Sequence, residues 1–179
     1  MNDMPDKVFT VGHSTRSIEA FVALMRSFGV QVVVDIRTVP RSRTNPQYNL
    51  DVLPGLLQQE GMDHRRIAAL GGLRKKSKTV APHTNGLWRN RSFHNYADHA
   101  LGAEFAAGLD ELIELSEARR CAIMCSEAVW WRCHRRIVAD HLLVRGIEVM
   151  HIMDIGKATR AQLTPGAEVH GLKVEYPLP

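Results

Sequence analysis

Short apolar runs alternate with amphipathic stretches along most of this chain of 179 residues. Between residues 17 and 28, apolar side chains recur at helical spacing, and Gly29 supplies a stop signal for the helix. Short apolar runs bounded by polar or turn-forming residues are typical of buried strands. We therefore predict helices over residues 17–28, 49–60, 100–118 and 132–145, and strands over residues 8–12, 30–37, 62–67, 121–125 and 147–152.

This alternation is typical of an α/β fold. Strand–helix–strand units with right-handed crossovers build a mainly parallel open sheet with helices on both faces. We expect about five strands in one domain over residues 1–179, with its core at 8–155. The polar, basic stretch at about 71–95 is expected to leave the sheet as a long irregular loop. The tail at 156–179 holds one further edge-strand candidate, at 169–176.

Composition narrows the class of protein. The chain is 45% hydrophobic and 23% charged, which is typical of globular proteins. Its first residues, MNDMPDK, are polar and precede no long apolar run, so neither a secretory signal nor a membrane span is predicted. The odd number of cysteines, Cys121, Cys125 and Cys133, disfavours a disulfide framework. We expect a cytoplasmic protein with reduced thiols and no membrane partner.

The net charge of +4 is unevenly distributed. Residues 35–95 hold eleven Lys and Arg against four Asp and Glu, and residues 119–145 hold six Arg against two acids. The segment between them, 96–118, holds six acids and no Lys or Arg. Such a distribution favours an anionic small molecule or a nucleic acid as partner, and a solvated surface is the alternative.

Three of the predicted strands run directly into polar residues. Ligands of open α/β sheets lie outside the carboxyl ends of the strands, so we expect these residues to form one site. A local role is the alternative, such as a helix cap for Ser14. Asp35 is either a turn acceptor or a charged partner for Arg37 or Arg41. The residues at these strand ends are Gly12, His13 and Ser14, then Asp35, Arg37 and Arg41, then Cys125 and Glu127.

Three arginines occur at the start of the last predicted helix. Arg132, Arg135 and Arg136 stand at i, i+3 and i+4, which would place them on one helix face. Peptide dipoles at this end favour a phosphate, sulfate or carboxylate and disfavour cations, so a bound anion would explain the arrangement. Pairing with the acids of residues 104–117 is the alternative.

Cys125 is the candidate nucleophile. A helix N-terminus and nearby arginines lower the pKa of a thiol, and Glu127, His134 or His13 could carry a proton. The alternative is an inert cysteine in the core. The spacing from Cys125 to Arg132 is similar to the cysteine loop of rhodaneses and protein tyrosine phosphatases, although six residues intervene here in place of five.

A metal site is a second alternative for the same segment. Cys125, Cys133 and His134, completed by His13 or His94, have the ligand types of a zinc site, although no paired CxxC spacing occurs. We predict no cofactor. A bound phosphate or sulfate would suit the basic pocket.

Cations and aromatic residues interleave in the basic stretch, a pattern that suits stacked nucleic-acid bases. The alternative is that the aromatic rings anchor the loop while the charges face solvent. The candidates are Arg74, Lys75, Lys76, Trp88, Arg89 and Arg91.

Four motifs together resemble the bacterial domain of unknown function 488 family: VGHSTRS, DIRTVPRSR followed by Asn45-Pro46, LGGLR at 70–74, and CSEAVWWRCHRRIVADHL. The resemblance covers residues 8–152 and implies a compact α/β fold with a shared pocket, but no reaction. Ser126 stands where we expect a smaller residue such as alanine. The resemblance carries over Gly12, His13, Ser14, Asp35, Arg37, Pro40, Arg41, Gly71, Gly72, Cys125, Glu127, Cys133, His134 and Arg135.

Overall fold

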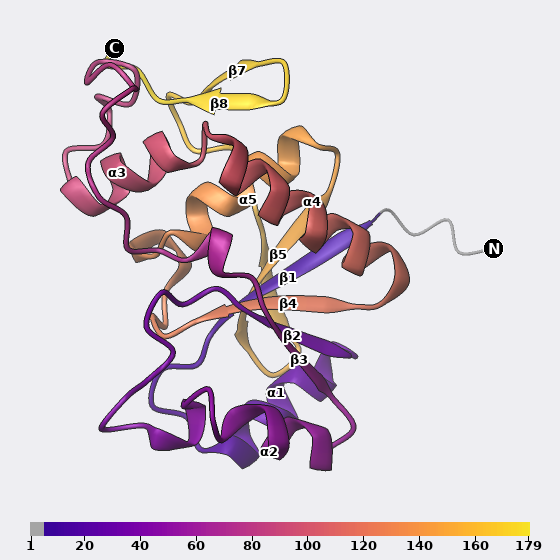
Figure 1. The fold of residues 1–179 in the computed structure, drawn as a ribbon. Coiled ribbons are helices and arrows are strands. Elements are labelled where there is room, and N and C mark those ends of the chain that lie inside the picture. The colour runs from indigo at the N-terminus through magenta and orange to yellow at the C-terminus, as the bar shows by residue number, and fades with distance from the viewer. Residues whose placement is uncertain (1–5) are drawn as a thin grey trace.

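A six-stranded sheet forms the centre of the fold in the structure, a computed structural model that describes residues 6–179 (Figure 1). The strand order is β3-β2-β4-β1-β5-β6, and every neighbouring pair is parallel except β5 and β6. The strands are β1 (Lys7–Gly12), β2 (Val32–Asp35), β3 (Asp63–Arg66), β4 (Cys121–Cys125), β5 (Glu148–Asp154) and β6 (Lys157–Arg160). The predicted mainly parallel α/β fold is confirmed.

The central position of β4 decides where the functional residues meet. Both β2 and β4 are buried along their whole length, as expected of strands covered on both faces. β4 lies between β1 and β2, with Gly12 beside Cys125 and Asp35 beside Met124 in the register. The carboxyl ends of three strands therefore lie next to one another at one edge of the sheet.

Helices cover both faces of the sheet (Figure 1). On one face, α1 and α2 pack their apolar side chains against β1 and β2 in one core cluster. On the other face, α3, α4 and α5 form the larger cluster with the C-terminal segment. The α-helices are α1 (Ile18–Ser27), α2 (Leu53–Gln59), α3 (Arg91–His99), α4 (Ala103–Ala118) and α5 (Arg135–Val144), and the 3-10 helices are η1 (Pro46–Tyr48), η2 (Ala68–Leu70) and η3 (Trp130–Arg132).

Three features of the structure differ clearly from the sequence-based prediction. The helix expected over 132–145 is divided, because Cys133 adopts an extended backbone between η3 and α5. The long basic loop expected over 71–95 is not confirmed, since α3 begins at Arg91, where the side chain of Asn90 caps the helix by accepting hydrogen bonds from the backbone N–H groups of Ser92 and Phe93. Residues 169–176 add no edge strand to the main sheet.

The C-terminal segment instead forms a separate hairpin of β7 (Glu168–His170) and β8 (Lys173–Glu175). One edge of the main sheet is β6, which turns back from β5 through Gly156 at a positive φ of 67°, and the other edge is β3. A glycine adopts this left-handed conformation without steric cost. Within residues 6–179, no helix is both long enough and apolar enough to cross a membrane.

Candidate functional site

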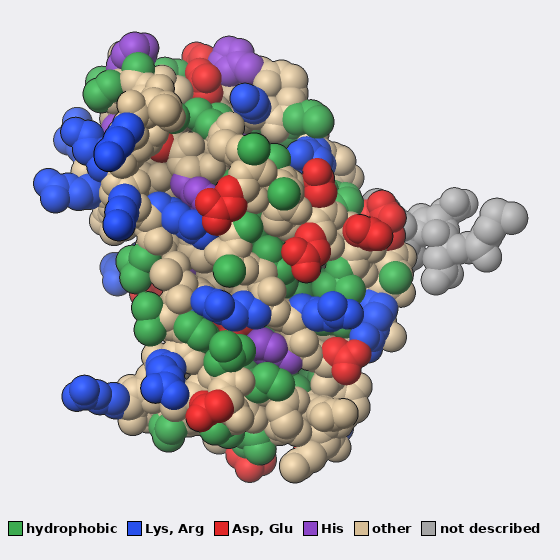
Figure 2. Space-filling model, in the orientation of Figure 1, with side chains coloured by type: hydrophobic (Ala, Val, Ile, Leu, Met, Phe, Trp, Pro, Cys, Tyr) green, Lys and Arg blue, Asp and Glu red, His purple; other side chains and the backbone are tan. Residues whose placement is uncertain are grey.

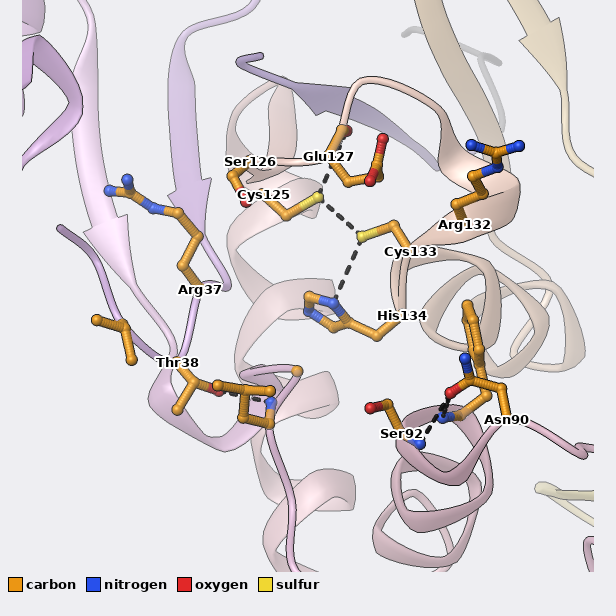
Figure 3. A pocket seen from close by; sticks show the side chains of 14 residues that line it. Arg37, Thr38, Asn90, Ser92, Cys125, Ser126, Glu127, Arg132, Cys133 and His134 are labelled. Carbon is orange, nitrogen blue, oxygen red and sulfur yellow. Dashed lines mark hydrogen bonds between the residues drawn. The ribbon is translucent and has the colours of Figure 1, made fainter. Parts of the chain in front are cut away.

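A cavity of about 480 Å³ opens beside the carboxyl ends of β2 and β4 (Figure 3). Its wall combines four segments that are far apart in the sequence: residues 37–39 after β2, residues 72–73, the start of α3 at 90–93, and the loop from 125 to 134. The expectation that strand ends supply one site is therefore met in part, because the end of β1 lies at a neighbouring hollow.

Two cysteines meet on this wall. The Sγ atoms of Cys125 and Cys133 are 2.8 Å apart, and the two residues are only 4% and 6% exposed. Cys125 ends β4, whereas Cys133 follows η3 and precedes the first turn of α5. Both thiols are free and both line the cavity.

The surroundings of Cys133 favour its thiolate. Its Sγ lies 3.4 Å from Nδ1 of His134 and accepts the backbone N–H of Arg135, at 3.5 Å, in the first turn of α5. Nε2 of His134 is 3.0 Å from the carbonyl of Ile36, which can only accept a hydrogen bond. Nε2 therefore carries a hydrogen, and Nδ1 faces the thiol as a proton acceptor. A helix N-terminus and a basic neighbour both lower the pKa of a thiol.

The two thiols have opposite pKa shifts. Burial, followed by the hydrogen bond to Cys133 and its charge, raises the pKa of Cys125 well above its ordinary value. Burial also acts to raise the pKa of Cys133, but the hydrogen bond with Cys125 and the nearby His134 and Arg135 outweigh it, so this pKa lies well below the ordinary value. The cysteine with thiolate character is therefore Cys133, and not Cys125, for which the sequence predicted that role.

Two neighbours of the His134 ring were not among the predicted catalytic or binding residues. Tyr96 packs edge-on against it, with ring centroids 4.9 Å apart. Gly72 also lies against the ring, because a β-carbon there would come within 2.6 Å of Nδ1. The LGGLR motif at 70–74 was the only sequence signal for Gly72. Tyr96 belongs to the aromatic residues that interleave with cations near Arg89 and Arg91, a pattern that gave no sign of its contact with His134.

The three arginines predicted to share one helix face are separated. Arg135 is 1% exposed and donates to Thr10 Oγ1 and, at 2.6 Å, to the carbonyl of Glu127, so it holds the loop after β4. Arg136 lies over the ring of Trp88 and donates to Thr164 Oγ1. Only Arg132 lines the cavity, and it is solvent-exposed. The predicted placement of the three arginines on one helix face is therefore wrong, because α5 begins at Arg135. Among the described residues, none of the three pairs with an acid of α4.

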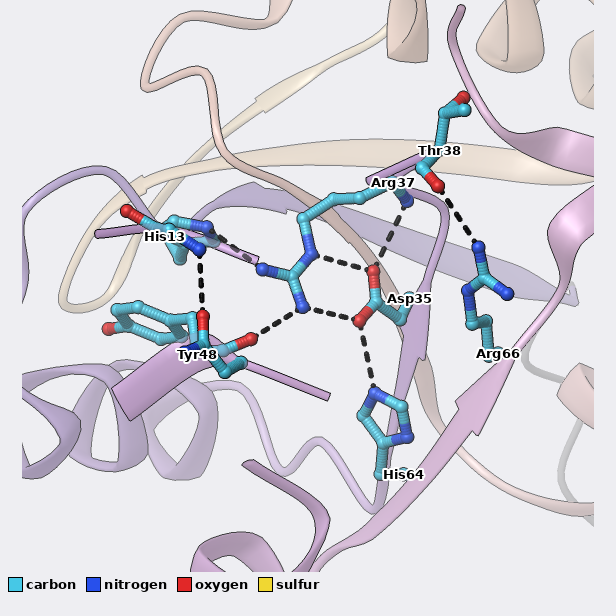
Figure 4. Close-up of polar contacts among 9 residues, drawn as sticks. His13, Asp35, Arg37, Thr38, Tyr48, His64 and Arg66 are labelled. Atoms are coloured by element: carbon cyan, nitrogen blue, oxygen red, sulfur yellow. Dashed lines mark hydrogen bonds and ion pairs between the residues drawn. The ribbon is translucent and has the colours of Figure 1, made fainter. Parts of the chain in front are cut away.

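Asp35 and Arg37 form a buried ion pair below the site (Figure 4). Arg37 donates to both carboxylate oxygens of Asp35 and to the carbonyl of Tyr48, and His64 contacts the same carboxylate. Burial acts to raise the pKa of Asp35, but the hydrogen bonds from Arg37 and His64 lower it to about 2. The guanidinium charge of Arg37 is thus matched by Asp35, and Figure 3 shows it turned away from the cysteine pair.

A second hollow of about 420 Å³ adjoins the first and shares Arg37 and Glu127 with it. His13 and Ser14 line it, together with Arg41 after β2. His13 stacks on Tyr48 with ring centroids 4.0 Å apart and donates from Nδ1 to the carbonyl of Ser14. Burial, reinforced by the charge of Arg37, lowers the pKa of His13 to about 4. His13 is therefore neutral and lies apart from the thiol pair.

Gly12 has a packing role at the junction of β1 and the loop after β4. A β-carbon there would lie 1.7 Å from the carbonyl oxygen of Glu127. The same carbonyl accepts from the Arg135 side chain. Neither hollow is lined by Gly12. Its predicted anion-binding role is therefore replaced by close packing of one backbone segment on another.

The predicted nucleic-acid-binding residues divide into anchored and exposed ones. Arg74 bonds the carbonyls of Ala68 and Gly71 and lies 3.4 Å from Glu104. Trp88 stacks on Phe93 at 5.0 Å and is an anchor of the core. Figure 2 shows Lys and Arg side chains projecting along one edge of the molecule. The exposed cations of this group are Lys75, Lys76, Arg89 and Arg91.

The zinc alternative has no support in residues 6–179, where no group of three or more His, Cys, Asp or Glu side chains is arranged to hold a metal ion. The cysteine pair and His134 remain a set of proton-exchanging groups.

Comparison with known proteins gives no significant match to any curated protein or to any solved structure. One family matches, the one described as "Domain of unknown function DUF488", over residues 17–142. This stretch covers most of the chain and includes every residue that lines the larger cavity. The chain therefore belongs to the DUF488 family.

Proposed function

We propose that the larger cavity is the active site of an enzyme that acts on a phosphate-containing or nucleotide-like anionic substrate through a cysteine thiolate. The observation that carries this proposal is the position of Cys133 between His134 Nδ1 and the backbone N–H of Arg135, on the wall of a cavity. A thiolate prepared in this way is a nucleophile, and the neighbouring His134 is its base.

A balanced reaction can be written with the residues of this wall. His134 Nδ1 takes the thiol proton of Cys133, and the sulfur attacks phosphorus while the P–O bond to the leaving group breaks. The leaving oxygen receives the proton from His134. Water then attacks phosphorus, Glu127 takes a proton from it, and the S–P bond breaks to restore the thiolate.

Electrostatics support an anionic substrate. Arg132 stands at the rim of the cavity, exposed and without a carboxylate partner in the described part of the chain. Arg135 is buried beneath the loop after β4, and among residues 6–179 it has no carboxylate partner either. These cations favour negative charge on the sulfur and on a ligand in the cavity.

The test is the pH dependence of iodoacetamide alkylation, followed by peptide mass spectrometry, with and without inorganic phosphate. We expect Cys133 to be modified well below pH 8, earlier than Cys125, and to be protected by phosphate. Titration of Cys133 near the ordinary value of about 8.5 would contradict the proposal. The Cys133→Ser variant should then lose turnover of phosphorylated compounds, while Cys121→Ser, at the far end of β4, keeps it.

A second candidate function is the binding of nucleic acid. The observation that favours it is the set of exposed, unpaired cations near the start of α3: within residues 6–179, Arg89 and Arg91 have no acid within ion-pair distance. Lys75 and Lys76 lie in the preceding loop and are also exposed. Such a surface would attract phosphate groups by counterion release.

Binding of a single-stranded oligonucleotide at several salt concentrations tests this candidate. We expect affinity to fall steeply as the salt concentration rises. In the double variant Arg89→Gln, Arg91→Gln, the slope of log affinity against log salt concentration should decrease by about two, one released counterion for each arginine. The matched control is Arg26→Gln on α1, which pairs with Glu60 on the opposite face of the sheet. Binding that ignores salt, or equal loss in the control, would overturn it.

A further inference from the structure

We propose that Cys125 and Cys133 are a dithiol that exchanges with low-molecular-weight disulfides and closes reversibly to an intramolecular disulfide. The inference needs the thiolate of Cys133 but no phosphorylated substrate, so it goes beyond the proposed function. It assigns a redox modification to the same cavity wall.

The first support is the geometry of the pair. The two sulfurs are already 2.8 Å apart, against about 2.05 Å for a disulfide bond. Each thiol is fixed from a different side, Cys125 by its register with Gly12 in the sheet and Cys133 by the first turn of α5. Closing the bond requires the two sulfurs to approach by about 0.8 Å.

The second support is the division of roles between the thiols. The attacking group in disulfide exchange is a thiolate, and Cys133 has the lowered pKa. The charge of Cys133 is one of the causes that raise the pKa of Cys125. When Cys133 enters a mixed disulfide, that charge is lost, and Cys125 becomes easier to deprotonate at the moment when it must attack.

The exchange balances with oxidised glutathione as the oxidant. The thiol proton of Cys133 passes to His134, the thiolate attacks one sulfur of glutathione disulfide, the S–S bond breaks, and one glutathione leaves with the proton from His134. The thiol of Cys125 then loses its proton to water, its sulfur attacks the sulfur of Cys133, and the second glutathione leaves and takes up a proton from water. Two protein thiols lose two electrons and two protons, and the oxidant becomes two thiols.

The third cysteine supplies an internal control. Cys121 lies at the opposite end of β4, is fully buried and lines neither hollow. Burial raises the pKa of Cys121 to about 11. It should therefore take no part in the exchange.

The experiment treats the reduced full chain with oxidised glutathione, quenches with acid, and maps disulfides and alkylated cysteines by mass spectrometry. We expect a Cys125–Cys133 disulfide, one alkylatable thiol at Cys121 after unfolding, and recovery of all three thiols with dithiothreitol. The Cys125→Ser variant should stop at the mixed disulfide on Cys133, and Cys121→Ser should still close the bond.

A wild-type chain that keeps three alkylatable thiols, or that forms a disulfide through Cys121, would overturn the inference. Peptide mapping of the wild type decides this even if a serine variant does not fold. The failures are distinguishable: disulfide closure without phosphate protection of Cys133 contradicts the proposed function alone, and phosphate protection without closure contradicts the dithiol alone.

Discussion

Gly72 lies directly against the imidazole ring of His134, at a place where a β-carbon would come within 2.6 Å of Nδ1. The ring is also held by the edge-on contact with Tyr96 and by the hydrogen bond from Nε2 to the carbonyl of Ile36. Gly72 therefore positions the nitrogen that faces Cys133. A residue without a side chain contributes here to the ionisation of a thiol.

Replacing this glycine should weaken the thiolate. In Gly72→Ala the new methyl group displaces His134 Nδ1 from Cys133, so the pKa of Cys133 rises. A hydrogen bond to a charged group contributes about 1.5 kcal/mol, so alkylation of Cys133 near pH 6.5 should slow about tenfold. The control is Gly55→Ala on α2, where a β-carbon meets nothing within 4 Å. Identical pH profiles for both variants would show that Gly72 does not position the ring.

The Asp35–Arg37 pair should make the fold sensitive to charge removal. Asp35→Asn leaves the buried guanidinium of Arg37 without its counter-charge, and breaking a buried pair costs about 3–5 kcal/mol. Urea unfolding at pH 7 measures this. Asp63→Asn, which removes an exposed partner of Arg119, serves as the control and should change stability little.

The carboxylate of Asp35 should also make the unfolding free energy depend on pH in the acid range. The pKa of Asp35 is lowered from 3.8 to about 2, so the unfolded chain takes up a proton first as the pH falls. Its contribution is therefore present above about pH 4 and is lost towards pH 2, by roughly 2 kcal/mol. Asp35→Asn should remove this part of the pH dependence. An unchanged acid limb would contradict the assignment.

Buried histidines should also destabilise the fold on acidification, beginning at a higher pH than the loss of the Asp35 contribution. Burial lowers the pKa of His13 and of His141 to about 4, and of His151 to about 3, from an ordinary value of 6.5. The unfolded chain therefore binds protons first, and stability falls as the pH drops from about 6.5 towards 4. Each histidine contributes a slope of about 1.4 kcal/mol per pH unit. We expect the unfolding free energy of His141→Leu, measured between about pH 6.5 and 4, to depend on pH less steeply than that of the wild type, by the slope of one histidine.

The C-terminal segment should contribute to stability through one hydroxyl group. Tyr176 donates its O–H to Asp140 on α5 at 2.7 Å, and both residues are buried. Tyr176→Phe leaves that carboxylate oxygen without its donor and should cost about 1–3 kcal/mol. Val169→Ala, at an exposed position on β7, is the control. Equal stability of the two variants would mean that the hydrogen bond contributes nothing.

The pattern of apolar residues predicted the strands that are buried along their length. It did not predict the strand that forms through contacts with a neighbouring strand. The strands β1, β2 and β4 are almost wholly buried, so their apolar runs were visible in the sequence. β6 has the sequence KATR, which carries no alternation, and it forms because a tight turn at Gly156 returns the chain along β5. No local pattern encodes such a strand.

The sequence predicted the location of the candidate site better than the roles of its individual residues. A parallel sheet brings strand ends together, which located Cys125 and the loop that follows it. The sequence offered Arg37 as one possible partner of Asp35 but could not separate this from a turn role. It did not indicate that Cys133 takes the extended backbone that divides the helix. The lowered pKa of Cys133 depends on the hydrogen bond with Cys125 and on the orientation of the His134 ring, and both arise only from packing.

The position of β4 between β1 and β2 also has a consequence for the order of folding. β1 and β4 pair in parallel from Val8 with Cys121, so more than a hundred residues must be folded back before this pairing closes. Such non-local pairings are slow to form. The cavity wall needs this closure as well as the start of α5, so the acidic thiol should be absent from any earlier intermediate. Pulsed alkylation of Cys133 at low pH during refolding would therefore time the arrival of the native sheet.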